Sequence, residues 1–366
     1  MRKLYSLLFA LPFLLSFFVT QQAKASHIMG SDISFRCLGG NQYEVVVTVY
    51  RDCSGISMPT SIPVDITSTC GNQTVTAALS SGQSGQEVSQ LCPTAVSTCA
   101  GGLLPGVQVY TYVATVTVNP NCGVYTFSYD ECCRNPSNNI VNPTSQWFLV
   151  RATLNSNAVV CNNAPTFTSL PVPYFCINQP VNYSHGAIDV DGDSLVYSLI
   201  APLNDAGNNI PYTGTFTPTN PMPTASGFNF DSQTGQMSFT PTQTGVYVVD
   251  VLVQEYRNGV LIGTTMRDIQ IVIINCNNAP PAVNNCLNLQ SVTGGVVIDC
   301  NSLGVCPGQN VSFTIGARDP NGQPVTVTSN IAQSIPGAIL TTIPGPTPDS
   351  IRVSFSWTPT GTDTRS

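Results

Sequence analysis

The stretch HGAIDVDGDSLVYSL places Asp189, Asp191 and Asp193 at alternate positions around Gly192. Calcium prefers oxygen ligands, and three carboxylates on such a loop can supply part of its coordination shell. Asp231, in the stretch FNFDSQTG, is a candidate further ligand from a separate loop. No Glu follows at the position that an EF-hand loop requires, so this would be a calcium site built from separate loops.

The same residue types are also typical of an acidic turn. Asp side chains cap backbone amides, and Gly accepts a positive φ. A second copy of the stretch keeps Asp319, Asn321 and Gly322 but has Gln323 in place of the third Asp. The second copy therefore favours a turn, while the first leaves both interpretations open.

Other patterns that carry enzymatic chemistry are missing from the sequence. Asp130 and Glu131 are neighbours on a predicted strand, so they face opposite sides and cannot form a glycosidase pair. The sequence contains no nucleophile elbow, no metalloprotease helix motif and no phosphate loop. We therefore predict a protein that is not an enzyme and needs no cofactor, with calcium as the one candidate ion.

The first residues predict a secretory signal peptide. Arg2 and Lys3 precede the apolar run 4–19, and Ala23-Lys24-Ala25 forms the cleavage motif, so we expect cleavage between Ala25 and Ser26. No later stretch is long and apolar enough for a membrane span. Cleavage would leave 9 of the 12 basic residues against 19 acids, a net charge of 9 − 19 = −10. Such a chain lacks the basic patches that nucleic-acid binding needs.

The mature part contains all 14 cysteines of the chain. An even, high cysteine count in an exported protein predicts disulfide bonds. A zinc site is disfavoured, because the sequence has no C-x-x-C pair and only two histidines, His27 and His185. We expect His27, close to the mature N-terminus, to begin a strand.

Strand patterns recur along the whole mature chain. Residues alternate between apolar and polar in runs rich in Val, Tyr, Thr and Phe, and Gly, Pro and Asn separate these runs. The clearest examples are YEVVVTVYRDC, VQVYTYVATVTV, VYTFSYDECC, QWFLVRATL, GVYVVDVLVQEY and RDIQIVII. The sequence predicts an all-β protein made of sandwiches.

An internal repeat sets the expected domain boundaries. CNNAP occurs at Cys161 and again at Cys276, and CINQPVNYSHGAID from Cys176 aligns without a gap to CPGQNVSFTIGARD from Cys306. MSFTPT and FSWTPT then match further on. We predict a signal peptide at 1–25, a cysteine-rich β-domain at 26–160, a first repeat at 161–275 and a second repeat at 276–366. The second repeat lacks counterparts of the last two strands of the first, so the chain is expected to be a fragment.

The repeat also assigns His185 a structural role. Its counterpart in the second copy is Ile315. A position that holds isoleucine in the sister copy is expected to pack in a core.

The repeat further suggests disulfide pairs. Equivalent cysteines should behave alike, which predicts Cys161–Cys176 and Cys276–Cys306, with Cys286–Cys300 inside the second loop. Eight cysteines remain for the first domain, in a connectivity that the sequence does not give: Cys37, Cys53, Cys70, Cys92, Cys99, Cys122, Cys132 and Cys133. Because neighbours on a strand point to opposite faces, Cys132 and Cys133 are expected to bond different partners.

Two segments carry a family resemblance. ASHIMGSDISFRCLGGNQYEVVVTVYRDC together with SYDECCRN resembles the N-terminal region of large cell-surface proteins of gliding Gram-negative bacteria. Many of those proteins carry immunoglobulin-like or PKD-like repeats and end in a gliding-motility-associated, type IX secretion sorting domain. The module from GAIDVDGDSLVYSL to GVYVVDVLV is similar to cadherin-like and immunoglobulin-like repeats of bacterial adhesins. The resemblance implies tandem, disulfide-bonded β-sandwich domains of these types, the last one incomplete.

Two functions follow from these observations. The first is a non-enzymatic, secreted or outer-surface protein of adhesin or structural type, associated with adhesion or gliding, which binds extracellular protein or glycan surfaces. The alternative is the carbohydrate-binding accessory region of a larger secreted hydrolase. An exposed row of aromatic side chains would support the alternative, and the candidates are Tyr43, Tyr110, Tyr112 and Trp147. The sequence does not predict the oligomeric state.

Overall fold

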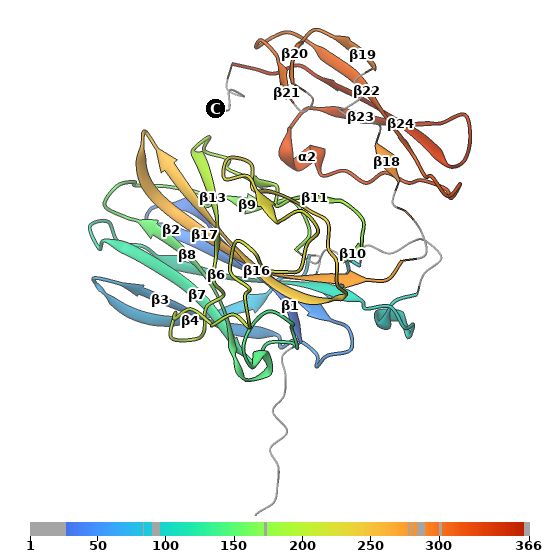
Figure 1. Cartoon of the computed structure of the whole chain (residues 1–366). Coiled ribbons are helices and arrows are strands. Elements are labelled where there is room, and N and C mark those ends of the chain that lie inside the picture. Colours follow the sequence, from blue (N-terminus) through green and yellow to red (C-terminus); the bar gives the residue numbers. More distant parts are fainter. Residues whose placement is uncertain are drawn as a thin grey trace, which may run out of the picture.

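The computed structural model describes residues 27–82, 84–89, 96–171, 174–276, 279, 281–283, 290–299 and 302–361. The predicted signal peptide with its Ala25–Ser26 cleavage site lies outside these residues, as do Cys92, Cys286 and Cys300. The described chain is all-β, as the sequence predicts, with several sheets and multiple disulfides. Figure 1 shows the N-terminal strands, in blue to green, beside the long orange strands β16 and β17, with the red C-terminal strands in a separate group.

The N-terminal part consists of strands with an alternating burial pattern. In β2, Tyr43, Val45, Val47 and Val49 are all buried, with less buried residues between them, which is the period of a strand with one face in a core. The elements of this part are β1 (Ile28–Gly39), β2 (Gln42–Asp52), β3 (Ser61–Ser68), β4 (Gly71–Leu79), β5 (Gln86–Glu87), η1 (Thr98–Ala100), β6 (Val107–Thr117), β7 (Val124–Cys132), η2 (Pro143–Ser145) and β8 (Trp147–Asn155).

The first repeat adds short strands and one long hairpin. Its strands are β9 (Thr166–Phe167), β10 (Tyr174–Cys176), β11 (Val181–Ser184), β12 (Ala187–Ile188), β13 (Ser194–Ile200), β14 (Asn229–Phe230), β15 (Gln236–Phe239), β16 (Gly245–Arg257) and β17 (Val260–Ile274). A small sheet in the order β11-β15-β14 packs on one face of β16 and β17. The hairpin side chains in this core are Tyr247, Val249, Val251, Val253, Ile269, Ile271 and Ile273.

Strand β17 joins the two parts into one sheet. One edge of β17 pairs with β16, and the other edge pairs in turn with β8, β1 and β10. The strand pairings therefore run in a closed circuit in the order β1-β2-β6-β4-β3-β7-β8-β17 and back to β1. We expected the segments 26–160 and 161–275 to form separate sandwiches. They share one sheet instead, because β17 extends beyond its own sandwich.

The second repeat forms its own sheets. Its elements are β18 (Ala282–Val283), β19 (Gln290–Thr293), β20 (Val296–Asp299), β21 (Ser302–Gly304), β22 (Val311–Arg318), α2 (Ile331–Ser334), β23 (Ile339–Pro344) and β24 (Ser350–Trp357). The main sheet has the order β18-β22-β24-β23, with β19 also paired to β22. No counterpart of the β16–β17 hairpin occurs among the described residues of this repeat.

The disulfides differ from the expected pairs. The predicted bonds Cys161–Cys176 and Cys276–Cys306 do not form: Cys161 bonds Cys37, and Cys176 bonds Cys276. The cause is the strand pairing, since β10 runs parallel to the end of β17 with Cys176 beside Ile274, two residues before Cys276. Cys306, the counterpart of Cys176, is exposed and free.

Three further bonds lie in the N-terminal part. Two of them connect loops, Cys53–Cys99 and Cys70–Cys122. Cys132 and Cys133 bond each other across a cis peptide, which corrects the expectation of separate partners. The expectation was wrong because it assumed that the extended strand continues through both residues, whereas β7 ends at Cys132.

Candidate functional site

The aspartate stretch forms a tight turn between β12 and β13. The Oδ1 atom of Asp189 accepts hydrogen bonds from the backbone N–H groups of Asp191 and Asp193, both at 2.9 Å. Gly192 has a φ of 80°, which favours glycine at this position. The turn predicted from the sequence is therefore present.

The second copy repeats this turn. Oδ1 of Asp319 accepts from the N–H of Asn321 at 2.8 Å and from that of Gln323 at 3.0 Å. Since Gln323 replaces the third aspartate, the turn does not depend on that charge.

Asp191 and Asp193 bind neighbouring segments of the chain. Asp191 accepts hydrogen bonds from the backbone N–H and the side-chain amide of Asn163, at 2.9 and 2.8 Å. The Arg257 guanidinium, from the end of β16, lies 2.8 and 2.6 Å from the two oxygens of Asp193 and 3.2 Å from Asp191. The turn thus fastens β16 to the segment that follows β8.

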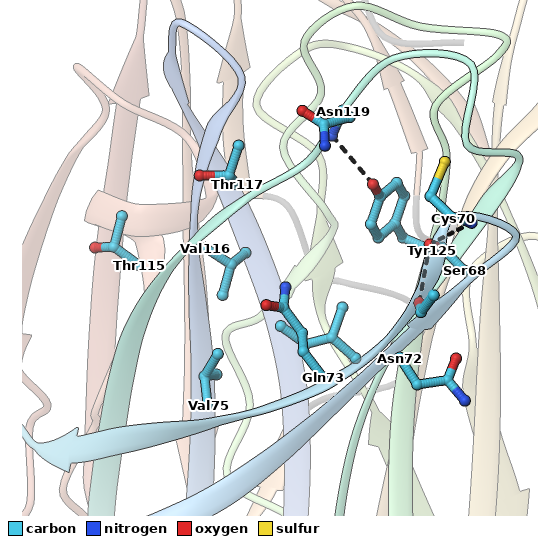
Figure 2. A pocket seen from close by; sticks show the side chains of 12 residues that line it. Ser68, Cys70, Asn72, Gln73, Val75, Thr115, Val116, Thr117, Asn119 and Tyr125 are labelled. Carbon is cyan, nitrogen blue, oxygen red and sulfur yellow. Dashed lines mark hydrogen bonds between the residues drawn. The ribbon is translucent and has the colours of Figure 1, made fainter.

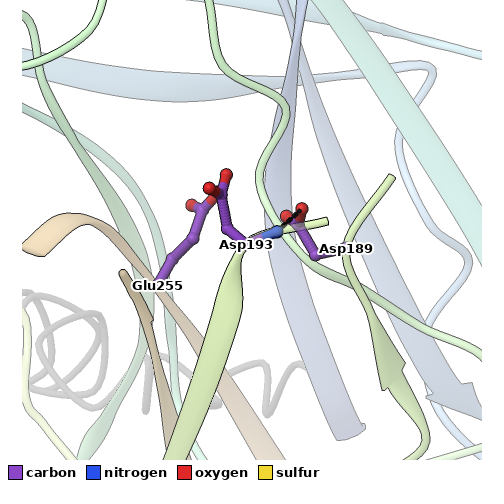
Figure 3. Close-up of side chains that lie close together, drawn as sticks. All are labelled: Asp189, Asp193 and Glu255. Atoms are coloured by element: carbon purple, nitrogen blue, oxygen red, sulfur yellow. Dashed lines mark hydrogen bonds between the residues drawn. The ribbon is translucent and has the colours of Figure 1, made fainter. Parts of the chain in front are cut away.

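Glu255 on β16 completes a cluster of three carboxylates. Oxygens of Asp189, Asp193 and Glu255 lie within 4.8 Å of one another, and Figure 3 shows the three side chains converging from the turn and from β16. Glu255 is fully buried, and the side-chain amide of Asn162 donates to both of its oxygens at 2.9 Å. A Cβ at position 263 would lie 2.8 Å from a Glu255 oxygen, so Gly263 gives the carboxyl its space.

The carboxylates change one another's proton affinity. Burial and the neighbouring Asp189 raise the pKa of Glu255 to about 9. Burial also raises the pKa of Asp189, whose Oδ2 is buried without a hydrogen-bond partner among the described residues. The cluster therefore holds a proton at neutral pH. A divalent cation could replace that proton, and the donor set of carboxylate oxygens suits calcium.

The predicted calcium ligands are only partly brought together. Asp189 and Asp193 belong to the cluster, whereas Asp191 and Asp231 do not. Asp231 is exposed and caps its own turn by accepting from the N–H of Gln233 at 2.8 Å, which lowers its pKa. Sequence reasoning missed Glu255 because it is far from the turn in the chain and reaches it through the pairing of β13 with β16.

A second carboxyl pair lies on the other face of the hairpin. Asp250 and Asp268 are cross-strand neighbours on β16 and β17, and both are 1% exposed. An oxygen of Asp268 lies 2.6 Å from Nη1 of the buried Arg134. Burial, and next the neighbouring Asp268, raise the pKa of Asp250 well above its ordinary value, so Asp250 is the protonated partner.

The core role predicted for His185 is confirmed. Its side chain is fully buried and packs edge-on against the rings of Tyr183 and Phe167. Burial, and next the nearby Arg267, lower the pKa of His185 well below its ordinary value, so the imidazole is neutral. His27 lies directly before β1.

The N-terminal sheet contains a polar groove where β4 and β6 separate. These two strands pair only at Ala78–Val113 and Leu79–Tyr112 and then diverge. The groove has a volume of about 460 Å³. Figure 2 shows its lining of amide, hydroxyl and apolar side chains, which includes Asn72, Gln73, Thr115, Thr117, Asn119 and Tyr125. Among the described residues, no carboxylate, histidine or basic residue lines it, and its Cys70 is in a disulfide.

The four candidate aromatic residues do not form an exposed row. Tyr43 and Tyr112 are 1% and 0% exposed, because they point into the core enclosed by the strand circuit. Tyr110 is half-buried and Trp147 is 38% exposed, so they form no continuous platform with the other two. These four residues therefore do not supply the exposed aromatic row that would support the alternative function, a carbohydrate-binding accessory region.

The sequence matches no family model and no curated protein. Within the described residues, no helix has the length and apolar character needed to cross a membrane. The disulfides are typical of proteins that mature in an oxidising compartment outside the cytoplasm.

Proposed function

We propose that this chain is a non-enzymatic, secreted or cell-surface binding protein of the adhesin type, with a structural role in adhesion or gliding. The observation that carries this proposal is the groove between β4 and β6. It is preformed and polar, and among the described residues no carboxylate, histidine, lysine, arginine or free thiol lines it. Such a lining suits binding.

The lining also indicates the class of ligand. Amide and hydroxyl side chains offer both donors and acceptors without net charge, which matches the hydroxyl groups of a neutral glycan. A volume of about 460 Å³ lies in the range of small-ligand sites. Without an aromatic platform each contact is weak, so an array of such proteins on a surface would bind through multivalency.

The two carboxylate clusters outside the groove, Asp189–Asp193–Glu255 and Asp250–Asp268, are also consistent with a binding role. Asp193 is tied to Arg257, Glu255 to Asn162, and Asp268 to Arg134. These three carboxylates thus make contacts that hold the fold, and the Asp250–Asp268 pair is buried away from solvent.

The groove can be tested with neutral trisaccharides of glucose, mannose or galactose, observed by saturation-transfer NMR on the mature protein. We expect one class to bind, and Asn72→Ala with Gln73→Ala to weaken it about tenfold through lost hydrogen bonds. Gln86→Ala, an exposed change outside the groove, should leave binding unchanged. The proposal fails if no trisaccharide binds, or if a peptide strand binds the groove and the sugars do not.

We further propose that calcium binds at Asp189, Asp193 and Glu255 in exchange for the shared proton. Because the pKa of Glu255 is about 9, calcium should raise the melting temperature more at pH 9 than at pH 6. Glu255→Gln should abolish the calcium effect while the protein remains folded. A melting temperature that millimolar calcium leaves unchanged at both pH values would rule this site out.

A further inference from the structure

The second repeat contains an apolar groove that its own residues do not fill. The groove lies on the β22–β24–β23 sheet and has a volume of about 370 Å³. Its lining includes Val305 from the segment before the sheet, Phe313, Ile315, Val353, Phe355 and Trp357 from the sheet, and Ile331 from the short helix α2. Apolar surface of this kind usually packs against another element.

The first repeat shows what covers the equivalent surface. Phe313 and Ile315 align with Tyr183 and His185 at an offset of 130 residues (313 − 183 and 315 − 185), and FSWTPT aligns with MSFTPT. In the first repeat Tyr183, Met237 and Phe239 pack in one core with the β16–β17 hairpin, and Met237 and Phe239 are at most 4% exposed. In the second repeat Phe355, the counterpart of Met237, is buried, but Trp357, the counterpart of Phe239, is only half-buried. The groove is therefore the site at which a hairpin like β16–β17 would lie.

Cys306 supports the same conclusion independently. Its counterpart Cys176 bonds Cys276, two residues beyond the end of β17. Cys306 follows Val305 at the groove and is free and exposed. A hairpin in the groove would place the residue equivalent to Cys276 beside Cys306.

We propose that this groove binds a β-hairpin that presents alternating aliphatic side chains and carries a cysteine two residues beyond its second strand. The aliphatic face would complete the core of the repeat, and the cysteine would bond Cys306. A second copy of the described residues cannot supply this hairpin, because its own β16–β17 is already packed in the first repeat. The occupant is therefore a different polypeptide segment.

The test uses the mature protein and a synthetic peptide of residues 245–276, which contains β16, β17 and Cys276. The chain has two tryptophans, so Trp147→Phe leaves Trp357 in the groove as the only one. We expect the peptide to shift the Trp357 emission to shorter wavelength as the ring becomes buried. A shift that appears on concentrating the protein without peptide would show that a second copy fills the groove, and would overturn the proposal.

Two variant peptides test which face of the hairpin enters the groove. Changing the inward Val249, Val251 and Ile271 to Thr should weaken binding at least about tenfold, since each loses buried apolar area. The same change at Val248, Leu252 and Val272, on the other face, should leave binding within about twofold. Equal binding of both peptides, or no emission change with any peptide, contradicts the proposal without requiring a variant of the protein.

The covalent step is tested with glutathione disulfide as oxidant. The thiols of Cys306 and peptide Cys276 lose two electrons and two protons to one glutathione disulfide, which becomes two glutathione molecules, and one S–S bond forms. Mass spectrometry should find this adduct at Cys306. Cys306→Ser should keep the Trp357 shift and lose the adduct. Binding without an adduct at Cys306 would mean a different strand register and would overturn the assignment.

Discussion

Asp250 is a buried acid whose proton stabilises the fold. Its pKa is raised by burial and by Asp268, so its contribution to stability is complete below the ordinary carboxyl pKa and is lost as the pH rises toward the raised value. We predict that the free energy of unfolding falls above about pH 4 by up to about 1.4 kcal/mol per pH unit. Asp250→Asn keeps a hydrogen-bond donor toward Asp268 and should remove this slope.

Urea unfolding of both proteins at pH 5, 6, 7 and 8 measures the effect, with the exposed Asp205→Asn as a control that keeps the slope. An unchanged pH dependence in Asp250→Asn would mean that Asp250 is ionised in the folded protein.

At the scale of elements, the 189–193 turn connects β12, β13 and the segment that follows β8. We predict that Asp189→Ala, in chelator-treated buffer, lowers stability by about 1–2 kcal/mol, because two backbone N–H groups lose their acceptor. Asp189→Asn keeps an acceptor oxygen and should cost less than half of that.

The exposed cap Asp231 provides the comparison. Asp231→Ala removes the same kind of turn bond from an exposed site and should have a smaller effect, since water replaces the lost acceptor. Thermal denaturation ranks the three variants. If Asp189→Asn proved as damaging as Asp189→Ala, the carboxylate charge and not the cap would hold the turn.

Local sequence patterns predicted which segments form strands, but they did not predict which strands pair or which cysteines bond. Runs such as YEVVVTVYRDC and GVYVVDVLVQEY became β2 and β16, because alternation within a strand is a local property. The turn at Asp189 followed in the same way from Asp and Gly. Glu255 and the bonds of Cys161 and Cys176 depend on which strands meet across the sheet. The repeat could not show this, because β17 pairs with strands that the second repeat lacks.

At the scale of the whole molecule, the N-terminal strands depend on β17. Their interior core comes from residues 28–164, but the β1 and β8 edges and the patch around Met29 are covered by β17. We predict that residues 27–165, which keep Cys37 and Cys161, self-associate through the open edges and lose several kcal/mol of stability, about the amount expected from lost burial. The fragment of residues 27–276 contains β17, which pairs with both edges, so it should not self-associate through them.

Sedimentation velocity and urea unfolding of the two fragments measure this difference. A stable, monomeric 27–165 fragment would show that the N-terminal strands form an independent domain, as the repeat boundary suggested.

The pairing of Gly30 with Ile269 has a consequence for biogenesis. The first strand of the protein meets one of its partners only after 239 further residues (269 − 30) have been synthesised. Until then the edge of β1 that pairs with β17 has free backbone N–H and C=O groups, which can pair with another chain. The order of synthesis therefore leaves β1 open to pairing with other chains until β17 has been made, and completion of the sheet is expected to be slow.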